Sequence, residues 1–582
     1  MSFPDRDAVL AFLKENPDAT TKQEIARGLK VKGRERQTLR AVLKDLEADG
    51  TLKKTGRRAW AQSDAPPPTS VIRFERTDEN GELIARAFGK EGAYGPDLIY
   101  DGYSGKSRGP APGVGDRGLA RLKETGGVWT ARLMKLFEAR DEERPVTGVY
   151  LRTDRGGRVK PASRKIKHEL HVRDADRNGA EDGDLVMASP FPQRGYGPVR
   201  AAITQILGRR EDPRAASILS IAAYEIPTEF PADVIEQAQT AQPAKVERTD
   251  LRETPLITID PADARDHDDA VFAEELQDGF RVIVAIADVA AFVTPGSALD
   301  REALKRGNST YFPDRVVPML PFELSADACS LKEGQDRQCM AVEIEFDRSG
   351  TKRKHRFLRG LMRSAGALSY EEAQQAIDGQ PTERAAALLE PVLNPLWAAY
   401  EAVSKARARR APLELDLPER KVEIATDGTV AGIRTKERID AHTLIEEFMI
   451  QADVCAAEEL ETRNTPLLYR VHDAPSDAKI AALAEFLKTM DVKWPLGEKT
   501  QTNRFNRLLS DFAETDQAEA VSEIILRTQS QAIYSAENIG HFGLNLKKYA
   551  HFTSPIRRYS DLIVHRALIK ALKFGPDGLD EN

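Results

Sequence analysis

A run of acidic residues between two apolar segments constrains the fold of this chain more than any other feature. The ten residues DPADARDHDD carry five carboxylates, which belong to Asp260, Asp263, Asp266, Asp268 and Asp269. The run follows the strand-like segment PLITI and precedes the apolar residues 270–272. Like charges this close repel one another, so they cannot all stay ionised without a counter-charge. The fold must therefore bring cations to this loop or leave the loop open to water.

A bound divalent cation is one source of that counter-charge. Carboxylate oxygens are the ligands that Mg²⁺ and Mn²⁺ prefer. An EF-hand calcium loop is excluded because the sixth position counted from Asp266 is Val271, where that loop needs glycine. A solvated acidic loop is the alternative. The sequence thus predicts a Mg²⁺ site, with Mn²⁺ as the alternative ion.

A basic segment near the C-terminus complements the acidic run. Residues 541–574 sum to a formal charge of +6, whereas residues 251–350 sum to −10. The segment AHFTSPIRRYSDLIVHR contains the adjacent pair Arg557 and Arg558, whose planar guanidinium groups suit phosphate. An acidic metal cradle with an arginine clamp is what phosphodiester hydrolysis requires, because both stabilise charge on the phosphate. A structural ion pair between the two clusters is the alternative for the arginines.

The rest of the chain divides into several domains. Its 582 residues suggest about four of them, and 41% hydrophobic with 30% charged residues is typical of soluble globular proteins. No run of 18 apolar residues occurs, so we expect no membrane span. Three cysteines, expected as buried thiols, build no disulfide framework. Together with the absence of a secretory signal pattern, they suggest a reducing cytoplasm.

The first 60 residues carry a formal charge of +5 although the whole chain carries −7. Thr21 and Glu24 have capping-box spacing, which predicts a helix start near Thr21. Leucines at helical spacing predict a further helix from about Arg34 to Ala48, and residues 51–60 predict a basic hairpin. This pattern indicates a winged helix, with a protein-docking module as the alternative. Its wing would contact nucleic-acid phosphates through Lys53, Lys54, Arg57 and Arg58.

Between about residues 71 and 230, short β-rich runs alternate with glycine-rich turns. This texture predicts two small antiparallel barrels. The second barrel holds a basic stretch that would suit single-stranded nucleic acid, unless it is merely a solvated face. The basic residues of this stretch are Arg152, Arg155, Arg158, Lys160, Arg164, Lys165 and Lys167.

Four sequence blocks in a fixed order carry a family resemblance. TIDPADARDHDDAV resembles the catalytic signature of the ribonuclease II/ribonuclease R family, also called the RNB family. YFPDRVVPMLPFELSADACSL, LIEEFMIQADVCAAEEL and FTSPIRRYSDLIVHR match three further blocks of that family. The winged helix and the two cold-shock-like barrels resemble its ribonuclease R group. The resemblance implies a processive, Mg²⁺-dependent 3′→5′ exoribonuclease that releases nucleoside 5′-monophosphates.

The resemblance also implies roles for single residues. Asp260, Asp266, Asp268 and Asp269 match the four family aspartates that hold metal and activate water, and Asp263 lies outside the pattern. Arg557 matches the arginine that stabilises the phosphate, and Arg558 is expected to contact RNA with it. The remaining matches, which concern the terminal nucleotide, are Tyr311, Tyr370, Leu415 and Glu447.

Two of these matches bear on how the terminal nucleotide is held. Leu415 stands where many relatives have a phenylalanine that sandwiches the last base against the tyrosine matched by Tyr311, so the base clamp lacks one π-face. Glu446 and Glu447 lie about 100° apart on one helix, so they cannot face the site equally. Alignment with the family favours Glu447, which would contact the ribose and so select RNA over DNA.

We therefore predict a multidomain α+β protein with four domains. They are a winged helix (1–63), two cold-shock or OB-like barrels (64–145 and 146–230) and a large α/β RNB domain (231–582) that stops before the family's S1 barrel. The expected substrate is single-stranded or structured RNA with a free 3′ end, and the ribosome or RNA-decay factors are further candidate partners of a cytoplasmic monomer. A catalytically impaired RNA-binding or chaperone protein is the alternative, and a duplex-DNA-binding transcription factor would leave 520 residues unexplained.

Overall fold

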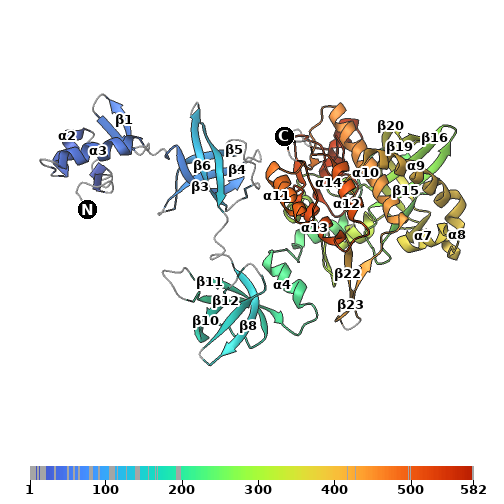
Figure 1. Cartoon of the computed structure of the whole chain (residues 1–582), viewed down its shortest axis with the longest axis horizontal. Coiled ribbons are helices and arrows are strands. Elements are labelled where there is room, and N and C mark those ends of the chain that lie inside the picture. Colours follow the sequence, from blue (N-terminus) through green and yellow to red (C-terminus); the bar gives the residue numbers. More distant parts are fainter. Residues whose placement is uncertain are drawn as a thin grey trace. The chain divides into compact units, whose positions relative to one another are not determined.

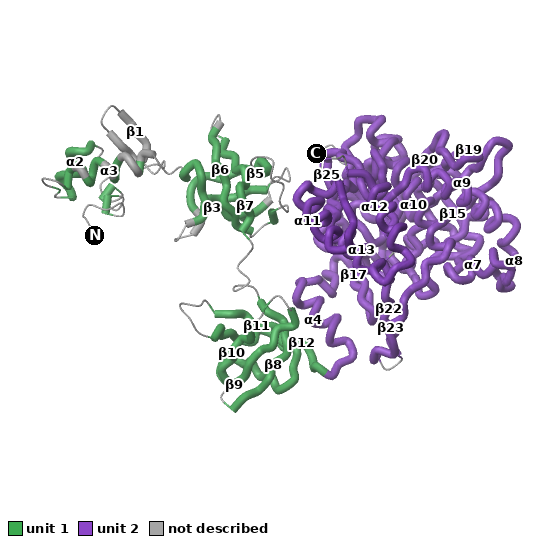
Figure 2. The backbone as a smooth tube through the Cα atoms, viewed as in Figure 1, with its two compact units in different colours: residues 1–210, 582 green, residues 211–581 purple. Residues whose placement is uncertain are grey.

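In the computed structural model the chain forms two compact units, residues 1–210 and residues 211–581 (Figure 2). The structure describes residues 8–9, 12–13, 21–29, 31, 35–48, 52–56, 59–62, 66–77, 83–89, 92–103, 112–113, 116–125, 128–137, 145–154, 156–163, 166, 168–191, 198–415, 417–425, 428–495, 497 and 500–579.

The N-terminal part of the first unit forms the helices and hairpin that the sequence predicts. Helix α2 (Lys22–Gly28) starts with a capping box, in which the Glu24 N–H donates to Thr21 Oγ1 and the Thr21 N–H donates to Glu24 Oε2 at 2.7 Å. Helix α3 (Glu35–Ala48) buries the predicted leucine stripe. Strands β1 (Leu52–Gly56) and β2 (Ala59–Gln62) pair antiparallel as the hairpin. The predicted wing contacts of Lys53, Lys54, Arg57 and Arg58 lie outside the described side chains.

Two five-stranded sheets follow (Figure 1). The first closes into a barrel in the order β3-β4-β5-β7-β6, and its strands are β3 (Thr69–Thr77), β4 (Leu83–Gly89), β5 (Gly92–Tyr103), β6 (Arg117–Thr125) and β7 (Val128–Phe137). The second runs in the order β10-β9-β8-β11-β12, and its strands are β8 (Val146–Thr153), β9 (Gly156–Pro161), β10 (Leu170–Val172), β11 (Asp184–Pro190) and β12 (Ala201–Arg209). The basic residues Arg152, Arg158 and Lys160 are exposed on this sheet, whereas Arg155, Arg164, Lys165 and Lys167 lie outside the described residues.

The second unit is built on a seven-stranded mixed sheet. Its order is β13-β20-β19-β16-β15-β14-β21, with two parallel pairs at the edges, β13 with β20 and β14 with β21. The strands are β13 (Thr249–Asp250), β14 (Ile257–Asp260), β15 (Asp269–Leu276), β16 (Gly279–Ala287), β19 (Asp336–Asp347), β20 (Lys352–Arg363) and β21 (Gly366–Ser369). Strand β16 is apolar along most of its length because both faces of the sheet are covered there.

Helices and three two-stranded sheets, two of which are hairpins, accompany this sheet. The helices are α4 (Ala215–Ala223), α5 (Ala232–Thr240), α6 (Ala298–Arg306), α7 (Tyr370–Ile377), α8 (Glu383–Leu388), α9 (Asn394–Arg410), α10 (Asp440–Thr462), α11 (Asp477–Lys488), α12 (Thr502–Phe512), α13 (Ala518–Thr528) and α14 (Tyr559–Leu572). The hairpins are β17 (Thr310–Tyr311) with β18 (Val316–Val317) and β22 (Glu419–Ile424) with β23 (Val430–Lys436). Strands β24 (Tyr469–Val471) and β25 (Ile533–Ser535) pair antiparallel although helices α11 to α13 lie between them in the chain.

The core of this unit lies where helices pack on the central strands of the sheet. Helix α9 packs on β15 and β16, and α10 packs on β16, β19 and α14. Cys329, Cys339 and Cys455 are free buried thiols as predicted, and burial raises the pKa of Cys339 and Cys455 to about 12. In the described part of the chain, no helix combines the length and the apolar character that a membrane crossing needs.

Candidate active site

The acidic run forms the loop between β14 and β15. Asp260 ends β14 and Asp269 begins β15, so these two paired strands fix both ends of the loop. Its middle is held by the Ser330 side chain, which accepts from the His267 N–H at 3.1 Å and donates to the Arg265 carbonyl at 2.9 Å. The fold therefore presents the predicted aspartates from a fixed loop.

The aspartates of this loop differ in exposure. Asp268 is buried, with 4% of its surface exposed, and Asp260, Asp266 and Asp269 are half-buried. Asp263 is exposed, as expected for a residue outside the family pattern. The structure thus separates four sheltered carboxylates from one solvated carboxylate.

The sheltered carboxylates are short of positive charge. Burial raises the pKa of Asp268 well above its ordinary value, and burial with repulsion from Asp260 raises the pKa of Asp269 to about 7. Asp268 Oδ1 accepts from the Ile556 N–H at 2.9 Å, but its buried Oδ2 has no hydrogen-bond partner. His267 Nδ1 lies 2.7 Å from Asp260 Oδ2, and this hydrogen bond raises the pKa of His267. The cluster therefore has a deficit of cations, which a ligand ion would fill.

The predicted arginine lies next to this deficit. Arg557 Nε is 3.8 Å from Asp268 Oδ2, and 47% of the Arg557 side chain is exposed. Asp561 fixes the turn before Arg557 by accepting from the Ser554 N–H at 2.8 Å. Arg557 can therefore contact both the acidic loop and an incoming anion.

Its neighbour Arg558 is placed differently. Arg558 Nη2 donates to Asp561 Oδ1 at 2.7 Å, and only a quarter of its side chain is exposed. Burial raises the pKa of the nearby Asp453 to about 7 despite the attraction of Arg558. The structure thus gives Arg558 acidic protein partners, although the sequence predicts an RNA contact for it.

Tyr311 lies on the short hairpin over the acidic loop. Its hydroxyl donates to Asp266 Oδ2 at 2.8 Å while about half of the residue stays exposed. The hairpin is joined to the arginine turn because the Ser309 N–H donates to the Arg557 carbonyl at 2.9 Å. Tyr311, Asp266 and Arg557 therefore belong to one connected group.

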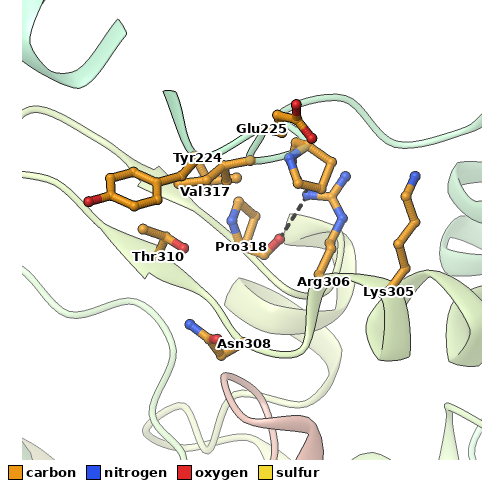
Figure 3. A pocket seen from close by; sticks show the side chains of 10 residues that line it. Tyr224, Glu225, Lys305, Arg306, Asn308, Thr310, Val317 and Pro318 are labelled. Atoms are coloured by element: carbon orange, nitrogen blue, oxygen red, sulfur yellow. Dashed lines mark hydrogen bonds between the residues drawn. The ribbon is translucent and has the colours of Figure 1, made fainter. Parts of the chain in front are cut away.

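The residue before Tyr311 faces another cavity. Thr310 lines a pocket of about 290 Å³ with Tyr224, Asn308 and other residues (Figure 3). Arg306 also lines this pocket, but its guanidinium already donates to Glu302 and to three backbone carbonyls. Successive residues of a strand point to opposite faces, so this pocket is separate from the side that carries the Tyr311 hydroxyl.

Tyr370 reaches the site through strand pairing. In the parallel pair of β14 and β21, Asp260 is the partner of Ser369, and Tyr370 follows directly as the first residue of α7. Its ring stacks on His442 of α10, with centroids 4.2 Å apart and an interplanar angle of 24°. Burial raises the pKa of Tyr370, and Asp269 and Asp260 raise it further. The structure therefore brings Tyr370 to the acidic loop.

A groove of about 720 Å³ lies beside His442 and is called here the α10 groove. Leu415, Leu417, Arg438, His442 and Glu446 are among its lining residues. His442 and Glu446 are four residues apart and so share one face of α10. Leu415 therefore lies on a cavity that adjoins the Tyr370–His442 stack.

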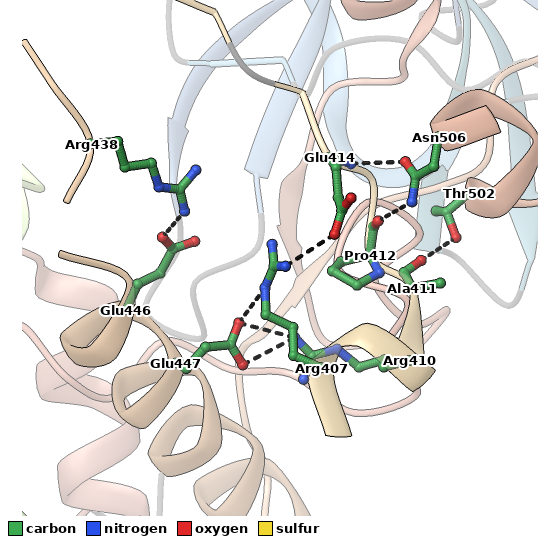
Figure 4. Close-up of polar contacts among 10 residues, drawn as sticks. All are labelled: Arg407, Arg410, Ala411, Pro412, Glu414, Arg438, Glu446, Glu447, Thr502 and Asn506. Atoms are coloured by element: carbon green, nitrogen blue, oxygen red, sulfur yellow. Dashed lines mark hydrogen bonds and ion pairs between the residues drawn. The ribbon is translucent and has the colours of Figure 1, made fainter. Parts of the chain in front are cut away.

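Glu447 faces another way (Figure 4). It has no exposed surface, and its carboxylate pairs with Arg407 Nε at 2.9 Å and with Arg410 Nη2 at 3.3 Å. Burial raises its pKa, and the two arginines offset this only in part. Glu446, which pairs with Arg438, lines the groove instead. The family resemblance predicts Glu447 as the substrate contact, whereas in the structure it is Glu446 that lies on the α10 groove.

The donor set fits a hard divalent cation in kind. Among the residues that the structure describes, no three His, Cys, Asp or Glu side chains already form a group able to hold a metal ion. Mg²⁺ commonly takes only one or two carboxylates and completes its shell with water and substrate phosphate. The unpartnered Oδ2 of Asp268 and the raised pKa values of Asp268 and Asp269 agree with such an open site.

Comparisons with known proteins agree with this arrangement of residues. The family model for the RNB domain matches residues 248–573, which is more than half of the chain, and a cold-shock domain model matches residues 159–231. Ribonuclease R of Vibrio parahaemolyticus is 33% identical over 580 residues, covering 97% of this chain and 68% of the relative. The chain belongs to the ribonuclease R group of the RNB family. The predicted family, the multidomain α+β fold and the 3′→5′ exoribonuclease function are thereby confirmed.

Other members of the ribonuclease R group give the same result. Ribonuclease R of Escherichia coli K12 is 33% identical, covering 97% of this chain and 70% of the relative. A solved structure of Mycoplasma genitalium RNase R in complex with double-stranded RNA has a TM-score of 0.70 at 25% identity, covering 77% of this chain and 80% of that one.

Yeast Ssd1, described as a pseudonuclease, shares the fold with a TM-score of 0.61 at 16% identity, covering 93% of this chain and 71% of that one. The fold alone therefore does not decide whether such a chain is catalytic.

Within this ribonuclease R-type site, sequence reasoning did not single out several residues. His267 lies inside the quoted acidic motif, so its position next to the aspartates was the available signal. His442 and Glu446 lie at helical spacing on α10, but only the tertiary structure shows which face meets the groove. In the sequence, Arg407 and Arg410 look like ordinary basic residues at the end of a helix, where positive charge interacts favourably with the helix dipole.

Proposed function

We propose that the acidic loop and Arg557 hydrolyse the 3′-terminal phosphodiester of RNA with the help of Mg²⁺, or of Mn²⁺ as the alternative ion, and release nucleoside 5′-monophosphates processively. The observation that carries the proposal is the buried Asp268 Oδ2, which has no hydrogen-bond partner and lies 3.8 Å from the half-exposed Arg557. A buried carboxylate oxygen without a partner is costly unless a ligand fills the place beside it.

The residues of the loop have distinct parts in this reaction. Asp260, Asp266, Asp268 and Asp269 are the candidate ligands, of which one or two would bind the cation directly; the bound cation would supply counter-charge and lower the pKa of water. Tyr311 and His267 fix the carboxylates of Asp266 and Asp260 through their hydrogen bonds. Arg557 binds the phosphate and stabilises the negative charge that develops on it, since its guanidinium is always protonated.

The terminal nucleotide is held by the groups around the loop. The exposed ring of Tyr311 offers a face on which a base can stack, and Leu415 packs on the base from the α10 groove without a second π-face. Tyr370 lies close enough to Asp260 to contact the same nucleotide. We assign the ribose contact to Glu446, because it lines the groove, and we assign to Glu447 the holding of two arginines.

The proposal is tested by digestion of poly(A) that carries the label at either end. We expect a 3′ label to be released first, 5′-AMP as the product, and activity only with Mg²⁺ or Mn²⁺. Trimming at the normal rate in excess EDTA would refute the metal mechanism. Intact RNA in the presence of Mg²⁺ would instead favour the binding-only alternative, which the retained aspartates and Arg557 otherwise disfavour.

A further inference from the structure

Arg407 bridges two carboxylates that belong to different parts of the chain. Its Nε lies 2.9 Å from Glu447 Oε1 on α10, and its Nη1 lies 3.1 Å from Glu414 Oε1 (Figure 4). Glu414 is the neighbour of Leu415, and Glu447 is the neighbour of Glu446. Each carboxylate thus stands next to a residue that lines the α10 groove.

The segment that carries Leu415 is fixed from its other side by α12. Thr502 Oγ1 donates to the Ala411 carbonyl and Asn506 Nδ2 donates to the Pro412 carbonyl, both at 2.7 Å. Asn506 Oδ1 also accepts from the Glu414 N–H at 2.9 Å. This backbone is therefore held at α12, and Arg407 connects its Glu414 side chain to α10.

The environment of this bridge is asymmetric. Glu447 has no exposed surface and keeps a second cation in Arg410, whereas 54% of the Glu414 side chain is exposed. The Glu447 end is thus a buried, doubly paired anchor, and the Glu414 end is a contact that water can reach. A planar guanidinium can hold both carboxylates at once through its fork, which a lysine ammonium does not reproduce.

We propose that Arg407 is a positioning residue that sets the distance between α10 and the Leu415 segment, and thereby the selectivity of the groove for the 3′-terminal nucleotide. The inference rests on the proposed function, because it takes the α10 groove as the seat of that nucleotide. Arg407 acts through Glu414 and Glu447 and needs no contact with RNA.

The test compares Arg407→Met with four variants of the same region. The substrates are five-nucleotide RNAs that end in a ribose or a 2′-deoxyribose, digested by the full chain with Mg²⁺. For Arg407→Met we expect KM for the all-ribose substrate to rise about tenfold with kcat within about threefold, and the ribose-over-deoxyribose ratio of kcat/KM to fall about tenfold. Glu414 lies at the exposed end of the bridge, so Glu414→Gln should also raise KM and lower the selectivity ratio, without lowering Tm.

The controls separate positioning from stability. Arg410→Met removes a Glu447 contact but leaves the bridge to Glu414, so it should lower Tm with little change in the selectivity ratio. Arg409→Met removes only contacts to Ser349 and Thr351 and should change neither quantity. The double variant Arg407→Met/Glu414→Gln should be no worse than Arg407→Met alone, because both changes break one bridge.

Two other outcomes have distinct meanings. If Arg407→Met lowers Tm while it and Glu414→Gln leave KM and the selectivity ratio at wild-type values, the positioning role is refuted and Arg407 is structural. If the wild-type chain degrades neither substrate, the proposed function fails first, and this result is recognisable without any variant.

Discussion

Two of the buried clusters of aspartate and arginine in the second unit differ in how completely they are paired. In the first, Arg359 is 1% exposed and binds Asp288 through Nε at 2.6 Å and Asp577 through Nη1 at 2.8 Å, while Arg248 also binds Asp288. Burial alone would raise the pKa of Asp288, but the two arginines outweigh it and lower that pKa. This cluster is a closed ion network.

The acidic loop is the second cluster, and there the balance is reversed. Asp268 is equally buried, but its arginine lies 3.8 Å away and is half exposed, so burial prevails and raises the pKa of Asp268. Asp288 is thus paired within the protein, whereas Asp268 lacks a close cation, as the proposed cation site requires.

The largest expected effect on stability belongs to the closed network. Arg359→Met would leave Asp288 and Asp577 buried with too few cations, and we expect the free energy of unfolding to fall by about 3–5 kcal/mol. Denaturant unfolding measures this change, and kcat per folded molecule should stay near the wild-type value. A loss of activity without a loss of stability would remove the distinction between the two clusters.

The adjacent residues Arg557 and Arg558 test the same distinction within four residues of Asp561. We expect Arg557→Met to lower kcat by about 10²–10³-fold with little change in Tm, since it removes charge stabilisation and breaks no tight ion pair. Arg558→Met should lower Tm, because it leaves Asp561 and Asp453 without their cation. The reverse pattern would mean that Arg558 is the arginine that contacts phosphate.

These contrasts also show which features of the site could be predicted from the sequence. The aspartates of the loop lie within ten residues of the chain, so their clustering and the need for a counter-charge follow from local sequence alone. Tyr370 is 110 residues from Asp260 and meets it only because β14 and β21 pair in parallel, and only the family resemblance pointed to it. Glu446 and Glu447 differ by one step of 100° on α10, and the packing of α10 on α9 decides which of them is buried.

The same difference between local and long-range features holds for the domains. Capping and leucine spacing predicted α2 and α3 closely, because these signals are local. The alternation of strands and helices after residue 250 predicted a large α/β domain, but not that its sheet is mixed with parallel pairs only at the edges. Strand order depends on long-range pairing, which local patterns do not encode. The four domain boundaries themselves stay a prediction.

A smaller effect concerns pH. Because the folded pKa of Asp269 is raised to about 7 from an unfolded value of 3.8, its contribution favours folding at acidic pH and is lost as pH rises through 7. For Asp288 the sign is opposite, because its lowered pKa contributes stability above about pH 4 that is lost on further acidification. Metal-free protein should therefore gain about 1–2 kcal/mol between pH 8 and pH 6, and Asp269→Asn should reduce this gain. Denaturant unfolding at several pH values would contradict the account if Asp269→Asn had the wild-type profile.

The central claim is that Asp268 is buried for ligand binding and not for stability, and Asp268→Asn tests it most directly with Asp263→Asn as the exposed control. RNA trimming with Mg²⁺ and thermal unfolding without metal are measured on the same preparations. We predict that Asp268→Asn loses about 10³-fold or more in kcat while its Tm stays equal or rises, and that Asp263→Asn matches the wild type in both. An Asp268→Asn protein that keeps its trimming rate, or one that loses activity only because it unfolds, would contradict the claim.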